Sequence, residues 1–105
     1  MTREERLARN EALFRDINER ISAIGDRFGT EALDIVCECV NTDCARSLAL
    51  SRADYERLRS SGKHFAVAPG HEQPDVERVL ENHKNFLVVE KLGAGAQVAE
   101  QLDPR

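Results

Sequence analysis

The three cysteines of this 105-residue chain, Cys37, Cys39 and Cys44, fall within eight consecutive positions. Thiolate sulfur is a preferred ligand of zinc in closed structural sites. Two cysteines separated by one residue of a strand point to the same face, with Cα atoms about 6.6 Å apart. A tetrahedral zinc ion needs sulfur atoms roughly 3.8 Å apart, which side-chain rotation and mild bending of the backbone can reach. The spacing Cys-x-Cys-x4-Cys therefore predicts a metal knuckle that supplies three thiolates.

A closed tetrahedral site needs a fourth ligand, and the chain contains three histidines. His71 follows a Pro-Gly pair in a turn that fixes the backbone, so it is the first candidate. His83 lies in a polar loop and is the second, and His64 opens a strand and is expected to point to solvent. Glu72 is a further alternative, although closed zinc sites prefer nitrogen and sulfur ligands. The sequence therefore predicts a structural Zn²⁺ ion bound by Cys37, Cys39, Cys44 and His71.

Three other interpretations of the cysteines stay open. Cys37 and Cys39 share a strand face with apolar residues, so they would also fit as small buried residues of the core. Redox-active thiols are the second alternative, but the acidic neighbours Glu38 and Asp43 raise thiol pKa values and disfavour thiolates. The third is a catalytic zinc with three thiolate ligands and an open position, where Glu72 would act as a base.

Residues 3–24 carry the clearest helical pattern in the chain, and Thr2 with Glu5 predicts a capping box at its start. The pattern is a heptad repeat of apolar residues with one asparagine. Its members are Leu7, Asn10, Phe14, Ile17, Ile21 and Ile24. One interpretation is an amphipathic helix that packs on the sheet of its own domain. The other is a coiled coil that forms a homodimer through residues 3–24, with Asn10 fixing the register.

The rest of the chain predicts a small, mainly antiparallel sheet with one short helix between its second and third strands. After residue 29 we expect strands over 33–39, 47–50 and 64–68, a helix over 52–60, and two strands joined by a turn over 76–89. Residues 76–82 are the ambiguous part, because Val76, Val79 and Leu80 also fit the spacing of a helix that begins after Pro74. The fold class is therefore α+β. We divide the chain into an N-terminal amphipathic helix (1–29), a zinc-knuckle α+β domain (30–92) and a C-terminal tail (93–105). Within that tail, residues 98–102 form either a short helix or a frayed end.

Composition excludes several classes of protein. A hydrophobic content of 41% with 32% charged residues is typical of a soluble globular protein. No apolar run is long enough for a signal peptide or a membrane span, so we expect a cytoplasmic protein with reduced thiols. Residues 46–63 carry five basic and two acidic side chains, which we interpret as a solvated helix face rather than a nucleic-acid surface. The chain has no glycine-rich phosphate loop and no G-x-S-x-G motif.

Several segments resemble a family of small, uncharacterised bacterial proteins. They are RNEALFRDINERI, VCECVNTDC, FAVAPGHEQPDVERVLENHKNFLVVEK and the terminal DPR. The resemblance covers nearly the whole chain, and its most specific parts are the CEC…C cluster, the APGHE turn and the LVVEK strand. We know of no activity established for that family. The resemblance implies that the three cysteines and His71 act as one unit.

These observations lead to one main functional hypothesis. We expect a non-enzymatic, zinc-stabilised binding or regulatory module that presents a surface to a protein partner. The main alternative is a zinc–thiol redox switch, in which oxidation ejects the metal and the freed cysteines pair. A small zinc-dependent hydrolase and a nucleic-acid binder are further alternatives.

Overall fold

The computed structural model describes residues 2–41 and 43–105. Thr42, in the predicted loop between Cys39 and Cys44, lies outside the described residues. The described elements, in chain order, are α1 (Arg3–Arg27), β1 (Ala32–Val36), β2 (Ser47–Ser51), α2 (Arg52–Leu58), β3 (His64–Val67), β4 (Glu77–Asn82), β5 (Leu87–Lys91) and α3 (Gly93–Gln101).

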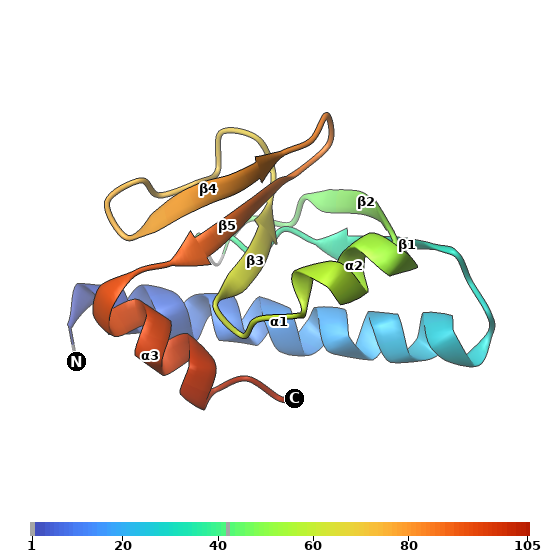
Figure 1. Cartoon of the computed structure of the whole chain (residues 1–105), viewed down its shortest axis with the longest axis horizontal. Helices are drawn as coiled ribbons and strands as arrows, with labels where there is room; N and C mark the ends of the chain where they lie inside the picture. Colours follow the sequence, from blue (N-terminus) through green and yellow to red (C-terminus); the bar gives the residue numbers. More distant parts are fainter. Residues whose placement is uncertain (1, 42) are drawn as a thin grey trace.

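The strands form two small antiparallel sheets. One is the hairpin β1–β2, and the other has the order β3–β5–β4 with β5 in the centre. Both sheets lie on the same side of α1, and α3 crosses α1 close to the start of the chain (Figure 1). The predicted α+β class is confirmed. So is the short helix between the second and third strands, where Ser51 caps α2 by accepting a hydrogen bond from Asp54 N.

Helix α1 confirms the long helix predicted at the N-terminus and continues it to Arg27. The hydroxyl of Thr2 accepts a hydrogen bond from Glu5 N at 3.1 Å, which is one of the two bonds of the predicted capping box. The Glu5 carboxylate accepts its bond from the Thr2 hydroxyl, at 3.2 Å, and not from the Thr2 backbone N–H that a complete box uses. The helix ends before Gly29, whose φ of 67° lies in the left-handed region that glycine adopts without steric cost.

The face that α1 buries differs from the sequence prediction. The buried stripe repeats every three or four residues and is mostly polar. Its members are Ala8, Glu11, Arg15, Asn18, Ser22 and Gly25. Leu7, Phe14 and Ile21 lie half-buried at its edge, whereas Ile17 and Ile24 are 44% and 55% exposed. The expectation that the apolar repeat packs on the protein's own sheet is therefore wrong for Ile17 and Ile24.

Buried charges opposite α1 explain this choice of face. Glu38 lies just after β1, Glu77 begins β4 and Lys91 ends β5, and all three are buried. A buried charge is stable only when it has a partner, and Glu11 and Arg15 of α1 supply partners. Lys91 Nζ lies 2.6 Å from Glu11 Oε1 and 3.5 Å from Glu77 Oε2. The contacts that these buried charges make with Glu11 and Arg15 therefore set the rotation of α1 about its own axis.

Strand β1 is shorter than the predicted strand over 33–39. It pairs with β2 so that Leu33 lies opposite Leu50 and Ile35 opposite Leu48, which places both pairs in the core. Beyond Val36 the chain continues as an irregular segment. Cys37 N donates to Arg46 O on one side, and Glu38 N donates to Ala66 O of β3 on the other, both at 2.8 Å. This segment joins the two sheets.

The C-terminal third of the chain contains a hairpin and a helix. The strand–turn–strand prediction is confirmed by β4 and β5, in which Val89 lies opposite both Phe65 and Val79. Residues 93–101 form α3, so the helix begins five residues earlier than predicted. Within the described residues, no helix has the length and apolar character that crossing a membrane requires.

Candidate metal centre

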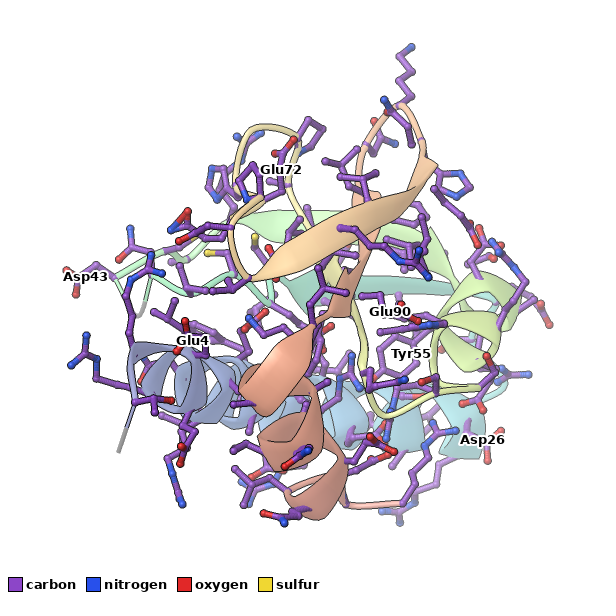
Figure 2. All side chains as sticks on the ribbon, turned by 60° about the vertical axis from the view of Figure 1, so that its left-hand side comes forward. Glu4, Asp26, Asp43, Tyr55, Glu72 and Glu90 are labelled. Atoms are coloured by element: carbon purple, nitrogen blue, oxygen red, sulfur yellow. The ribbon has the colours of Figure 1, made fainter. Side chains whose placement is uncertain are left out.

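The structure brings together the four side chains that the sequence predicted as zinc ligands. One ligand atom from each of Cys37, Cys39, Cys44 and His71 lies within 4.8 Å of every other. The Nδ1 atom of His71 lies 3.7 Å from Cys37 Sγ and 3.5 Å from Cys44 Sγ. In Figure 2, sulfur atoms lie between the loop that carries Glu72 and the segment that carries Asp43. These four residues, the ligand cluster, are close enough to hold a metal ion.

The distances of His71 Nδ1 from Cys37 Sγ and Cys44 Sγ match those around a tetrahedral zinc ion. Zn–S bonds of about 2.3 Å and Zn–N bonds of about 2.0 Å at tetrahedral angles separate sulfur and nitrogen by roughly 3.6 Å. The two sulfur–nitrogen distances in the structure lie within a few tenths of an ångström of that value. Three sulfurs and one imidazole nitrogen also form a donor set that is common in structural zinc sites.

Cys37 and Cys39 are held by the irregular segment after β1. Both are buried, and so is Glu38 between them. The side chain of Glu38 bonds Arg15 and Asn18 of α1, whereas the two cysteines join the ligand cluster. Cys37 Sγ also accepts a hydrogen bond from Ala68 N at 3.1 Å, which favours a thiolate.

Cys44 returns to the cluster through a tight turn that Asn41 organises. The Asn41 side-chain oxygen accepts from Asp43 N and its backbone oxygen accepts from Cys44 N, both at 3.0 Å. Asparagine stabilises turns in this way because its side chain reaches the backbone two residues further along. Cys44 is half-buried, so it is the most exposed of the three cysteines.

His71 reaches the cluster from a turn over residues 68–71. His71 N donates to Ala68 O at 2.9 Å, and Gly70 between them has a φ of 88°. Proline at the second position and glycine at the third are the preferred residues of a type II turn. The Pro-Gly pair therefore fixes the direction in which the imidazole leaves the backbone.

Burial raises the pKa of the Cys37 thiol, and the hydrogen bond from Ala68 N offsets only part of this effect. Burial also raises the pKa of Cys39. Both thiols are therefore protonated at neutral pH unless a cation replaces the proton, and a divalent metal does this because its charge stabilises the thiolate. High thiol pKa values disfavour the redox-active interpretation, since the thiolate is the reactive form.

The other candidate ligands lie outside the ligand cluster. His64 is half-buried rather than directed into solvent, and its Nε2 lies 3.1 Å from Glu90 Oε2. His83 stacks on Phe86 with ring centroids 4.3 Å apart and contacts Glu81 at 2.7 Å. Each of these two histidines therefore has a structural partner of its own.

A hollow of about 260 Å³ lies beside the cluster, between residues 39–41 and residues 70–73. It is smaller than the 300–1,000 Å³ that most small-molecule pockets occupy. Glu72 lines the hollow, but its carboxylate does not belong to the group of converging ligand atoms. Four protein ligands fill a tetrahedral shell, so the cluster has the form of a structural site rather than a catalytic one.

Sequence reasoning missed the polar contacts that connect the ligand cluster to α1. Arg15 Nε and Nη2 donate to the two carboxylate oxygens of Glu38 at 2.6 and 2.9 Å, and both side chains are buried. Asn18 Nδ2 donates to the same carboxylate at 3.0 Å. A signal existed, because residues 8, 11, 15, 18, 22 and 25 also follow a heptad spacing. Because most of these residues are polar, a search for apolar periodicity does not find the pattern.

No family model, no curated protein and no solved structure matches this chain. The resemblance to small bacterial proteins therefore stays a prediction, and the case for function depends on the geometry of the molecule itself.

Proposed function

We propose that this protein is a non-enzymatic, zinc-stabilised module that binds a protein partner. The observation that carries the proposal is the mutual spacing of three cysteine sulfurs and one histidine nitrogen. Thiolate-rich tetrahedral sites favour zinc over magnesium or calcium, which need oxygen ligands. Four protein ligands leave no position for a substrate on a four-coordinate ion.

The metal would act as a cross-link between three segments that are separated in the chain. The ligands come from the segment after β1, the turn before β2 and the loop between β3 and β4. A domain of about 100 residues buries a modest core, so a metal cross-link contributes a large share of its stability. Zinc would therefore keep the two small sheets in one arrangement and hold the surfaces around them in shape.

The surface for a partner is the uncovered side of α1. Leu13, Ile17 and Ile24 of α1, together with Phe28, the C-cap residue that follows the helix, are 44 to 77% exposed there. We call these four residues the exposed stripe. Apolar side chains that follow one helix face and remain open to solvent mark an interaction site in soluble proteins.

The test of the metal is elemental analysis of protein purified without chelator, together with His71→Asn. We expect one zinc per chain, and a loss of bound zinc and of several kilocalories per mole of unfolding free energy in the variant. His83→Asn is the matched control, because the same change removes an imidazole outside the ligand cluster. Its zinc content should equal that of the unmodified protein.

Two results would overturn the zinc assignment. One is a purified protein that contains no metal and does not bind added Zn²⁺. The other is an equal loss of zinc in the His71 and His83 variants, which would show that the substitutions act through folding rather than through coordination.

A further inference from the structure

We infer that the partner on the exposed stripe is a second copy of this chain, bound antiparallel to α1 about a two-fold axis. The inference depends on the proposed function in one respect: it names the partner that the binding module takes. The proposed contact differs from the coiled coil predicted from sequence, because it is made by the exposed stripe. Leu7, Phe14 and Ile21, which belong to the predicted coiled coil, lie at the edge of the exposed stripe or face the domain.

The first support is the area of the exposed stripe. Its four side chains are 60, 44, 55 and 77% exposed, in the order Leu13, Ile17, Ile24 and Phe28. Together they leave on the order of 400 Å² of apolar surface open, which is within the range of the largest patch on a typical monomer. A stable interface buries about 800 Å² per partner, with an apolar centre and a polar rim. The exposed stripe supplies such a centre, and the charged residues beside it supply a rim.

The second support is the spacing of the exposed stripe, which reads the same in both directions. The intervals between its residues are four, seven and four positions. In an antiparallel pair centred between residues 20 and 21, Leu13 faces Phe28 and Ile17 faces Ile24. A two-fold interface requires this self-complementarity, because each contact occurs twice with the roles of the copies exchanged.

The third support is charge. Asp16 and Arg27 are both exposed, and at 100° per residue they lie on the same flank of the exposed stripe. In the antiparallel register, Arg27 of one copy lies two residues from the position directly opposite Asp16 of the other copy. This offset is about 3 Å along the helix axis. The pairing therefore brings opposite charges together at both ends.

The two copies of Arg20 meet near the axis and repel each other. Salt at 0.15 M screens exposed charges over about 8 Å, so this repulsion weakens the pair without preventing it. We therefore expect a dimer that dissociates on dilution through the micromolar range.

The test is sedimentation velocity on the zinc-loaded protein from about 1 to 200 μM. The unmodified chain should shift from one to two chain masses across this range. Ile17→Glu combined with Ile24→Glu should stay monomeric throughout with unchanged circular dichroism, because both side chains are exposed. Val79→Glu combined with Leu80→Glu is the matched control, since these β4 residues are 44% and 39% exposed on another surface. That control should dimerise like the unmodified chain.

A charge exchange tests the orientation. Asp16→Arg should weaken the antiparallel dimer about tenfold, and Arg27→Asp added to it should restore the affinity. In a parallel pair the two changes do not compensate, because each residue would face its own copy.

The inference is overturned if the unmodified chain stays monomeric at 200 μM, or if the Ile17/Ile24 variant still dimerises. A different protein captured by the exposed stripe of a monomeric chain would refute the second copy but leave the binding module intact. Absence of zinc from a dimeric protein would instead refute the metal assignment and leave the dimer intact. The two failures are therefore distinguishable.

Discussion

Replacing Glu38 by glutamine removes one charge from a buried ion pair while nearly keeping the shape of the side chain. The Glu38 carboxylate accepts four hydrogen bonds: two from Arg15 at 2.6 and 2.9 Å, one from Asn18 at 3.0 Å and one from Ala66 N at 2.9 Å. A glutamine offers one oxygen and turns two N–H donors toward groups that also donate. At least two of the four bonds are therefore lost.

The expected loss follows from the burial of Arg15. Its side chain is 3% exposed and that of Glu38 is fully buried. Removing one member of a buried ion pair leaves an uncompensated charge and costs about 3–5 kcal/mol. A domain of this size has a total stability of about 5–15 kcal/mol, so Glu38→Gln should remove roughly a fifth of it or more. The zinc content should not change, because the Glu38 side chain faces α1 and not the ligand cluster.

The assay is urea unfolding of the zinc-loaded protein followed by far-ultraviolet circular dichroism. Glu90→Gln is the control, since Glu90 pairs with the exposed Arg78 and should contribute less than about 1 kcal/mol. Arg15→Met added to Glu38→Gln should recover part of the loss, because removing both charges avoids the buried unpaired one. The reasoning is refuted if Glu38→Gln loses less than about 1 kcal/mol, or if the two substitutions are additive.

Two further predictions concern other parts of the molecule. Burial raises the pKa of Glu11 to about 8 from an ordinary value of 4.5, so the unfolded chain releases this proton first as the pH rises. Its contribution to folding is complete below about pH 4.5 and is lost as the pH rises toward 8. Glu11→Gln should therefore gain stability relative to the unmodified protein from pH 5 to 8 in urea unfolding, and a constant difference would contradict this. Gly70→Ala and Gly29→Ala each place a side chain at positive φ with no atom within 4 Å, which costs about 1 kcal/mol in both. Only Gly70→Ala should weaken zinc binding in a competition titration, because it turns His71, and equal affinities in the two variants would contradict this.

The four members of the ligand cluster could be chosen from sequence because the signals were local. Three cysteines within eight positions confine their sulfurs to one small volume, whatever the rest of the chain does. The Pro-Gly pair before His71 restricts the turn to few conformations, and the structure contains that turn. The α+β class and the order of the central elements follow from the same kind of local pattern, which is why they were predicted correctly.

The face that α1 buries was decided only by the tertiary structure. The helix carries two sets of residues with heptad spacing, one apolar and one polar, and periodicity alone favours the apolar set. The choice depends on Glu38, Glu77 and Lys91, which become neighbours of α1 only when the sheets assemble. Glu38 lies 23 positions from Arg15 in the chain, and Lys91 lies 80 positions from Glu11. Burying those charges without partners would cost more than burying several apolar side chains of α1 in place of the polar ones would gain. Amino-acid type and spacing thus determined the ligand cluster and the helix itself, whereas contacts with distant buried charges determined which face of the helix is buried.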